Sequence, residues 1–287
     1  MKKILFALFL SVNLFSYAYT PNDLRFHCAE DTIKINKFLQ DGRESGLKNA
    51  NELISFYAQK LLGTPYVAHT LEGDKEKLTI NIDELDCTTF VETLLALAKT
   101  TMNERTTWRE YAMSLEQIRY RQGNMNGYSS RLHYMSDWVI DNNARGNITE
   151  VTAEFPRADS IVKTINFMTK HKDSYKSLKD DPDMVKKIKS VEIGYRQHKY
   201  PVIKKSQLRH KNVKETFMDG DVIFLVTKID GLDVSHLGII KFVDGDPHLL
   251  HASSVAMKVI VDDNDIFNML RKSKSNIGIR VIRLNND

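Results

Sequence analysis

The sequence predicts an α+β protein, and two patterns support this prediction. Apolar residues recur at helical spacing in the N-terminal half, whereas alternation with a period of two, broken by turns, dominates after Asp219. Helices that precede strands along a chain are typical of the α+β class. The 287 residues, of which 42% are hydrophobic, suffice for one well-packed core. We find no internal repeat and no linker, so we expect a single domain over residues 19–287.

The first 18 residues have the features of a secretory signal peptide. Lys2 and Lys3 precede an apolar run at residues 4–15, and residues 16–18 (Ser-Tyr-Ala) form a small-x-Ala cleavage site. The run is shorter than the roughly 20 apolar residues that a membrane span needs, and no second such stretch follows. We therefore expect an exported protein, periplasmic or secreted, that keeps no membrane span after cleavage behind Ala18.

Two helices are predicted in the first third of the chain. Apolar residues recur at helical spacing over residues 51–62, and Gly63 supplies the C-terminal stop. A second helix begins behind Asp86, which is a favourable N-cap residue, and continues to Ala98 with one apolar face. Cys87 then lies in the first turn of a buried helix.

The segment at about residues 100–215 is predicted to be a basic, largely helical insertion. Its first helix begins at the capping box Thr107-x-x-Glu110 and ends at Gly123. Further helical signals are the spacing of Ile161, Val162, Ile165 and Met168 and a helix start at Asp181-Pro182.

Charge is distributed unevenly along the chain. Residues 163–215 hold 15 Lys and Arg against 6 Asp and Glu, although the formal charge of the whole chain is only +4. The near-neutral total gives no electrostatic reason to expect a nucleic-acid partner. A basic face on the insertion could hold an anionic polymer such as cell-wall glycan, while a merely solvated face is the simpler interpretation.

Five short strands joined by turns are predicted after Asp219. Since consecutive strands with short connections pair as hairpins, we expect an antiparallel sheet of about five strands. The strands are expected at residues 221–226, 235–243, 248–253, 258–261 and 278–284.

Cys87 is the stronger of two candidate nucleophiles. The positive end of a helix dipole lowers the pKa of a thiol, and a thiolate is the reactive form of cysteine. Cys28 lies in an irregular stretch with no such setting. In an exported protein the alternative is a disulfide between Cys28 and Cys87.

A cysteine nucleophile needs a base, and the base needs an orienting partner. His236 stands at the start of a strand, and His251 on the next strand is close enough in sequence to pair with it across a hairpin. His248 competes with His251, but the two differ by an odd number of positions and so point to opposite sheet faces. We select His251, because His248 directly follows a turn.

A metal site or cofactor site has little support in the sequence. The chain has no Cys-x-x-Cys pair, no His-Glu-x-x-His helix and no glycine-rich phosphate loop. A zinc site built from Cys87, His236 and His251 is the remaining metal hypothesis, and we expect no cofactor.

Several motifs together resemble the NlpC-type papain-like cysteine hydrolases of bacterial cell walls. They are Gly-Thr-Pro-Tyr-Val at 63–67, Asp-Cys at 86–87, Gly-Asp-Val at 220–222, Ser-His-Leu-Gly-Ile at 235–239 and His-Ala-Ser at 251–253. The match covers about residues 51–284. Asp-Cys-Thr-Thr-Phe-Val-Glu and Arg-Leu-His-Tyr-Met-Ser-Asp-Trp resemble the branch associated with N-acetylmuramoyl-L-alanine amidase activity, and the long insertion also suits that branch.

The resemblance implies a papain-like core, in which the helix bearing the cysteine packs on the antiparallel sheet. It implies Cys87 as the nucleophile, His236 as the general base and His251 as the residue that orients the imidazole. Tyr66 would lie beside the nucleophile, with its hydroxyl near the substrate or oxyanion. Thr88-Thr89 departs from the Ser-Gly of many relatives that cleave stem peptides, which puts a simple stem-peptidase function in doubt.

Substrate contacts are expected from Asp86, Ser235 and a dense polar and aromatic cluster. Trp138 or Tyr134 could stack on a sugar ring, but the same composition is typical of an aromatic-rich core. The cluster consists of Arg131, His133, Tyr134, Asp137 and Trp138.

The expected activity is hydrolysis of the bond between N-acetylmuramic acid and L-alanine in peptidoglycan fragments or muropeptides, by a monomer. Two alternatives remain open. One is an endopeptidase that cuts between D-glutamate and the diamino acid of the stem. The other is a non-catalytic wall-binding protein in which Cys87 is paired with Cys28.

Overall fold

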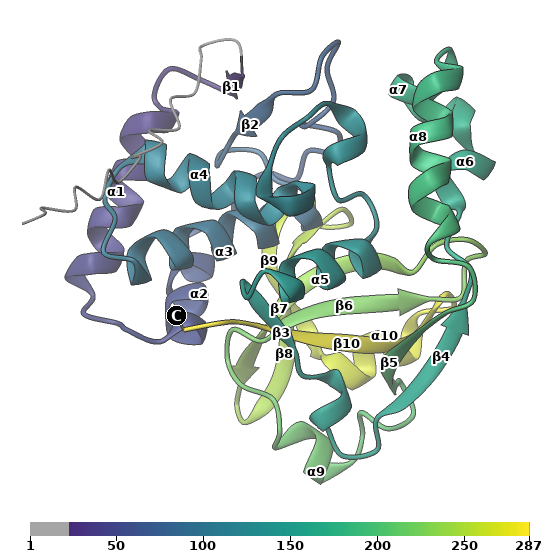
Figure 1. Cartoon of the computed structure of the whole chain (residues 1–287). Coiled ribbons are helices and arrows are strands. Elements are labelled where there is room, and N and C mark those ends of the chain that lie inside the picture. Colours follow the sequence, from purple (N-terminus) through teal and green to yellow (C-terminus); the bar gives the residue numbers. More distant parts are fainter. Residues whose placement is uncertain (1–22, 287) are drawn as a thin grey trace, which may run out of the picture.

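The structure is a computed structural model that describes residues 23–286. The signal peptide predicted at residues 1–18 therefore lies outside the described residues. The chain forms a layer of helices beside an antiparallel sheet, which confirms the α+β class (Figure 1). Within the described residues, no helix combines the length and the apolar character needed to cross a membrane.

Four helices form the N-terminal layer, and the helix that begins at Cys87 packs against the other three and against the sheet. Beyond its first turn this helix is almost completely buried. The helices predicted at residues 51–62 and behind Asp86 are both present, whereas the first helix of the layer was not predicted. The four are α1 (Asp31–Glu44), α2 (Ala50–Lys60), α3 (Cys87–Met102) and α4 (Trp108–Arg119).

Two helix boundaries differ from the sequence expectation. Helix α3 continues past Ala98 to Met102. The helix predicted to end at Gly123 already ends at Arg119, because Tyr120 adopts an extended backbone; Gln122 and Gly123 then have positive φ values of 54° and 70°. Consecutive residues with positive φ cannot continue a right-handed helix.

The main sheet of the described residues has eight strands, and all five predicted strands belong to it. Its order is β4-β5-β10-β6-β7-β8-β9, with β3 paired to β10, and every pairing is antiparallel. A separate parallel pair joins β1 (Leu24–Phe26) to β2 (Leu78–Ile80). The main strands are β3 (Ile148–Glu150), β4 (Asp159–Lys163), β5 (His198–Lys204), β6 (Val222–Thr227), β7 (Val234–Val243), β8 (Asp246–Ser253), β9 (Lys258–Asp265) and β10 (Asn276–Leu284).

The segment at about residues 100–215 is mainly helical, as expected, but it also contains three strands that were not predicted. It supplies β3, β4 and β5 to the main sheet, and Ile161 and Val162, predicted on a helix, lie in β4. β-branched residues favour a strand where a partner edge is available, and β5 provides that edge. The helix start at Asp181 is confirmed. The helices are α4, α5 (Met135–Ala144), α6 (Phe167–Lys170), α7 (Lys176–Lys179), α8 (Pro182–Ile193) and α9 (Lys211–Lys214).

Both faces of the sheet are covered. In β6, Val222 and Phe224 pack against the N-terminal helices, whereas Ile223 and Leu225 pack into a second core with α10 (Ile266–Lys272). This alternation follows the period of two in a strand. Helices α6 to α8 enclose a smaller core of their own and lie apart from α1 and α2 (Figure 1).

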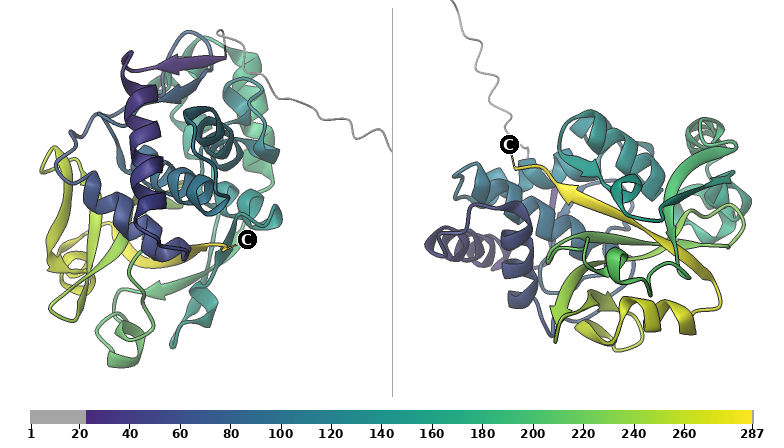
Figure 2. Two further views of the ribbon diagram at one scale, coloured as in Figure 1. Left: turned by 90° about the vertical axis from the view of Figure 1, so that its left-hand side faces the viewer. Right: turned by 90° about the horizontal axis from the view of Figure 1, so that it is seen from below.

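The C-terminal strand ties the sheet to the helices. Strand β10 runs across the molecule and ends beside the start of α2 (Figure 2). There, the side-chain oxygen of Asn286 accepts a hydrogen bond of 2.8 Å from the backbone of Ala50. This hydrogen bond and the contacts of β10 with α2 join the C-terminal end of the sheet to the helix layer.

Candidate active site

The start of α3 holds Cys87 in a defined position. Asp86 Oδ1 accepts a hydrogen bond of 2.8 Å from the backbone N–H of Thr89, and the Thr89 hydroxyl oxygen accepts one of 2.8 Å from the N–H of Asp86. This reciprocal capping box makes Cys87 the first helical residue, as the sequence predicted. The thiol therefore stands where the backbone N–H groups of the first turn have no helical partners.

Strand β7 brings its residues to the thiol. Helix α3 packs against β7 and β8, and the Cys87 thiol receives a hydrogen bond from the backbone of Leu237. His236 directly precedes Leu237 in β7. The packing of α3 on the sheet thus brings the Cys87 thiol to Leu237, which is far away in the sequence, and His236 is the chain neighbour of that contact.

His236 and His251 are hydrogen-bonded to each other. His236 Nε2 lies 2.5 Å from His251 Nδ1, and the two rings meet edge to face with their centroids 4.7 Å apart. His251 is opposite Gly238 in the neighbouring strand, and a Cβ at Gly238 would lie 2.9 Å from the Cβ of His251. A glycine is therefore needed at position 238 for the two imidazoles to meet.

The choice between His248 and His251 is settled by the sheet. His248 points away from the His236 pair, and its Nδ1 lies 2.8 Å from the carbonyl oxygen of Asp262. His251 is the histidine of β8 that contacts His236. The expectation from strand periodicity agrees with this arrangement.

Burial determines the protonation of the cysteine and the histidine. Desolvation, followed by the negative charge of Asp86, raises the pKa of the Cys87 thiol to about 12. Desolvation, followed by the neighbouring His251, lowers the pKa of His236 to about 3. The backbone N–H groups around the thiol lower its pKa, as expected at a helix start, but the loss of hydration outweighs them. The resting pair is a neutral thiol and a neutral imidazole.

A cavity of about 460 Å³ opens beside the nucleophile. It is bordered by both chain neighbours of Cys87 and by three further segments, which come from the loop before β2, the turn before α5 and the turn before α7. The lining residues are His69, Leu71, Glu72, Asp86, Thr88, Glu92, Tyr128, Arg131, Leu132, His133, Met135, Ser174, Tyr175 and Lys176.

Four predicted contact residues lie at or near this cavity. Asp86, Arg131 and His133 line it. Arg131 is held by Glu72, with Nη2 and Oε1 2.8 Å apart. Tyr66 is half-buried, and its pKa is raised by burial and next by the nearby Cys87 and Asp86, so its hydroxyl stays a hydrogen-bond donor.

Three predicted contact residues are buried elsewhere. Trp138 is 1% exposed and packs edge to face on Phe224, so its ring cannot stack on a sugar. The Tyr134 hydroxyl donates to Glu192 at 2.7 Å. Asp137 accepts two hydrogen bonds from Arg121, at 2.8 and 2.6 Å. From the sequence, these aromatic and polar residues could belong to a binding site or to a core. Their packing supports the core.

Ser235 also lies away from the cavity. Its side chain is exposed, and the hydroxyl donates to the side-chain oxygen of Asn276 at 2.7 Å. The residue stands where the register between β6 and β7 shifts, directly before His236. Because neighbouring residues of a strand point to opposite faces, a serine next to the histidine is not brought to the same site.

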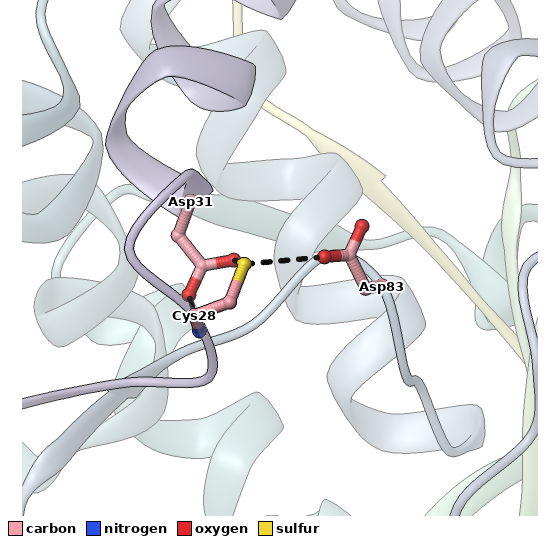
Figure 3. A group of neighbouring side chains, drawn as sticks. All are labelled: Cys28, Asp31 and Asp83. Carbon is pink, nitrogen blue, oxygen red and sulfur yellow. Dashed lines mark hydrogen bonds between the residues drawn. The ribbon is translucent and has the colours of Figure 1, made fainter.

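Cys28 and Cys87 are both free, so the disulfide alternative is not realised. The Cys28 sulfur lies between two carboxylates, 3.5 Å from Asp31 Oδ1 and 3.6 Å from Asp83 Oδ2 (Figure 3). These three side chains could offer metal ligands. However, the Lys34 ammonium is 2.5 Å from Asp83 Oδ2, and a lysine already supplies the positive charge there.

Sequence reasoning missed the part of the cavity wall that lies at the start of α7. Tyr175 and Lys176, the N-cap and the first residue of α7, line the cavity. Lys176 also pairs with Asp74 at 2.7 Å, although both side chains are well exposed. No local pattern distinguishes these residues from the other polar positions of the basic segment.

Comparison with known proteins identifies the family. Residues 57–279 match the model of the N-acetylmuramoyl-L-alanine amidase-like family. A search of curated proteins found no match.

Three solved structures illustrate the similarity. An N-acetylmuramoyl-L-alanine amidase from Bacteroides uniformis ATCC 8492 is 36% identical, with a TM-score of 0.77, and the match covers 82% of this chain and 99% of that chain. A Bacteroides fragilis protein provisionally described as a xylanase is 40% identical, with a TM-score of 0.73 and coverage of 79% and 98%. A Legionella pneumophila protein, 22% identical, shares the fold, with a TM-score of 0.68 and coverage of 89% and 95%. The chain therefore belongs to the N-acetylmuramoyl-L-alanine amidase-like family.

Proposed function

We propose that this protein is a cysteine amidase that hydrolyses the bond between the lactyl group of N-acetylmuramic acid and L-alanine. The observation that carries the proposal is the hydrogen-bonded pair of His236 and His251, on strands that pack against the helix that begins at Cys87. A thiol, an imidazole base and a group that orients the base are the parts that nucleophilic cysteine hydrolysis needs. The family supports an amide bond in peptidoglycan as the target.

The proposal includes a papain-like core. In the NlpC-type hydrolases that the sequence resembles, the nucleophile opens a helix and the base comes from an antiparallel sheet. Helix α3 and strands β7 and β8 have this relation. Export follows from the predicted leader at residues 1–18 and fits a substrate in the bacterial envelope.

The reaction would begin from the neutral pair. His236 Nε2 is engaged by His251, which leaves Nδ1 of His236 to accept the thiol proton as the Cys87 sulfur attacks the carbonyl carbon. The protonated His236 then gives this proton to the amine nitrogen of L-alanine as the carbon–nitrogen bond breaks. Water, deprotonated by His236, finally attacks the thioester carbonyl. The carbon–sulfur bond then breaks, the lactyl carboxylate is released, and the Cys87 sulfur takes the proton back from His236.

Two donors would stabilise the tetrahedral oxyanion. The backbone N–H of Cys87 lies in the first helical turn, where it has no acceptor within the helix. The Tyr66 phenol, held protonated by its raised pKa, is the second. Donors aimed at the developing charge typically contribute about 10²–10³-fold to the rate.

The cavity beside α3 would take the muramyl peptide. Arg131 and Lys176 supply positive charge for stem carboxylates, and Asp86 supplies a negative group next to the thiol. Tyr128 and Tyr175 offer aromatic faces in the same wall. Since the two chain neighbours of Cys87 border this cavity, a peptide bound there would have its first amide within reach of the sulfur.

The decisive experiment uses purified protein and a Cys87→Ala variant. Each is incubated with a muramyl tripeptide and with the same tripeptide lacking the sugar, and the products are identified by mass spectrometry. We expect release of the intact peptide from the sugar-bearing substrate alone, and no release by the variant. A xylooligosaccharide serves as a further substrate, and we expect no cleavage of it.

The other outcomes separate the alternatives. Cleavage within the peptide of either substrate would assign the stem endopeptidase. Peptide release that persists in the Cys87→Ala variant would remove Cys87 as the nucleophile. Binding of muramyl peptide without any product would assign the non-catalytic wall-binding protein.

A further inference from the structure

We propose that Asp262 is a positioning residue that sets which nitrogen of His251, and through it of His236, carries the proton. The inference rests on the proposed function, in which His236 is the base. Asp262 was not predicted from the sequence, because the strand expected at residues 258–261 ends one position before it. Strand β9 in fact extends to Asp265.

The three side chains form a diagonal row across three strands. His251 of β8 pairs directly with Ile260 of β9. Since Ile239 of β7 pairs with Leu250, the next residues along the two strands, Gly238 and His251, also lie opposite each other. His236 and Asp262 are each two residues from these partners, so both lie on the same sheet face as His251. Asp263 follows with its side chain exposed.

His251 Nε2 lacks a hydrogen-bond partner, although it is buried. Its other nitrogen, Nδ1, is taken by His236, and Nε2 has no partner at hydrogen-bond distance among residues 23–286. Asp262 Oδ2 lies 3.9 Å from this Nε2. The gap is too short to hold a bridging water and slightly too long for a hydrogen bond, so a small side-chain movement would complete the contact.

The carboxylate of Asp262 is itself held in place. Its Oδ1 accepts hydrogen bonds from the backbone N–H of Asn264 at 2.8 Å and from the side-chain amide of Asn264 at 3.1 Å. These donors occupy one oxygen and leave Oδ2 facing His251. The register of β8 and β9 shifts between His248 and Leu250, and such an irregularity bends the strand near Asp262.

This arrangement selects one pair of tautomers. A carboxylate can only accept, so the proton of His251 is favoured on Nε2, facing Asp262. His251 Nδ1 then accepts, and His236 Nε2 must donate to it across the 2.5 Å contact. His236 Nδ1 is left without a proton, which is the state required of a base toward Cys87. Asp262 would also stabilise the positive charge that His236 gains in the reaction and shares with His251.

A direct test needs neither a variant nor a substrate. In wild-type protein with ¹⁵N-labelled histidine, nitrogen chemical shifts and couplings report which ring nitrogen carries the proton. We expect the Nε2–H tautomer at both His236 and His251. A dominant Nδ1–H tautomer at either residue would overturn the inference.

The matched variants are Asp262→Asn and Asp263→Asn. The Asn264 donors will orient the new amide so that its oxygen faces them and its NH₂ group faces His251. That group donates, so the His251 proton should move to Nδ1, and His236 should carry its proton on Nδ1. We expect kcat for the muramyl tripeptide to fall at least about tenfold with little change in KM, while Asp263→Asn keeps wild-type kinetics.

The readouts separate this inference from the proposed function. If the wild-type protein cleaves no muramyl peptide, the proposed function fails, and the tautomers of wild type and Asp262→Asn still decide the role of Asp262. Unchanged tautomers and kcat in a folded Asp262→Asn variant would contradict the inference. A variant with a lower melting temperature but wild-type tautomers would show that Asp262 only stabilises the strand.

Discussion

The two cysteines of this protein both lie near a carboxylate, but they differ in their place in the fold and in the other groups around the thiol. Cys28 lies between Asp31 and Asp83 just before α1 (Figure 3). The Lys34 ammonium pairs with Asp83 there. Cys87 opens a buried helix, receives a backbone hydrogen bond from β7 and follows one carboxylate, Asp86.

The comparison shows that a carboxylate beside a thiol does not make a site. The carboxylates around Cys28 are balanced by a lysine that cannot act as a base while protonated. At Cys87 the nearby strand residues are neutral imidazoles, because burial lowers the pKa of both His236 and His251. A buried base that stays unprotonated at neutral pH is what separates the two regions.

Replacement of each cysteine by alanine should give the largest contrast. We expect Cys87→Ala to reduce peptide release more than about 10³-fold, because the thioester cannot form. Cys28→Ala should stay within about twofold of wild type, since a surface change of this kind costs little. Equal losses in the two variants would remove the distinction between the regions; the measurement is the initial rate of product release.

The pH dependence of alkylation sharpens the comparison. Because its pKa is raised to about 12, the Cys87 thiol should react with iodoacetamide about tenfold faster per pH unit from pH 7 to 9, without a plateau. Peptide mass spectrometry distinguishes the two sites. A rate for Cys87 that is already constant near pH 6 would instead reveal a preformed thiolate and imidazolium pair.

The glycine opposite His251 offers a steric test of the rigid sheet. In Gly238→Ala the new methyl group would lie 2.8 Å from the carbonyl oxygen of Leu250 and 2.9 Å from the Cβ of His251. We expect a loss of about 1–3 kcal/mol in the free energy of unfolding, measured in urea, together with a lower kcat. Gly194→Ala, where the nearest atom is 3.3 Å away, is the control; equal effects of the two changes would contradict the steric argument.

The smallest expected effect concerns half-buried His133 in the cavity wall. Burial, followed by Arg131, lowers the pKa of His133 to about 3, whereas the unfolded value is near 6.5. Between these values the unfolded chain binds a proton that the folded protein does not, so stability falls as pH decreases from about 6.5 towards 3. His133→Asn should reduce the drop in melting temperature between pH 7 and pH 4, and exposed His171→Asn should not.

The predicted elements that were found are those with a local cause. Asp86 caps its own helix through Thr89, three residues away, and the period of two in β6 to β10 is visible within each strand. The parity argument that put His251, not His248, beside His236 has the same origin. By contrast, β4 depends on its partner β5, which lies far along the chain.

The mixed result for the aromatic cluster has a related reason. Arg131 and His133 line the cavity, whereas Trp138, only five residues after His133, packs on Phe224 of the distant strand β6. Sequence composition does not distinguish an aromatic ring that faces a cavity from one that faces a core. His133 faces the cavity and Trp138 faces the core because different parts of the fold pack against each of them.

The amino-acid sequence by itself determined the α+β class, the cap before Cys87 and the strand faces of the two histidines, since capping and strand periodicity depend on near neighbours. The tertiary structure decided the protonation of Cys87 and His236, the approach of Asp262 to His251 and the four-segment cavity. These properties depend on desolvation and on contacts between distant segments, which exist only once the helix layer has packed on the sheet.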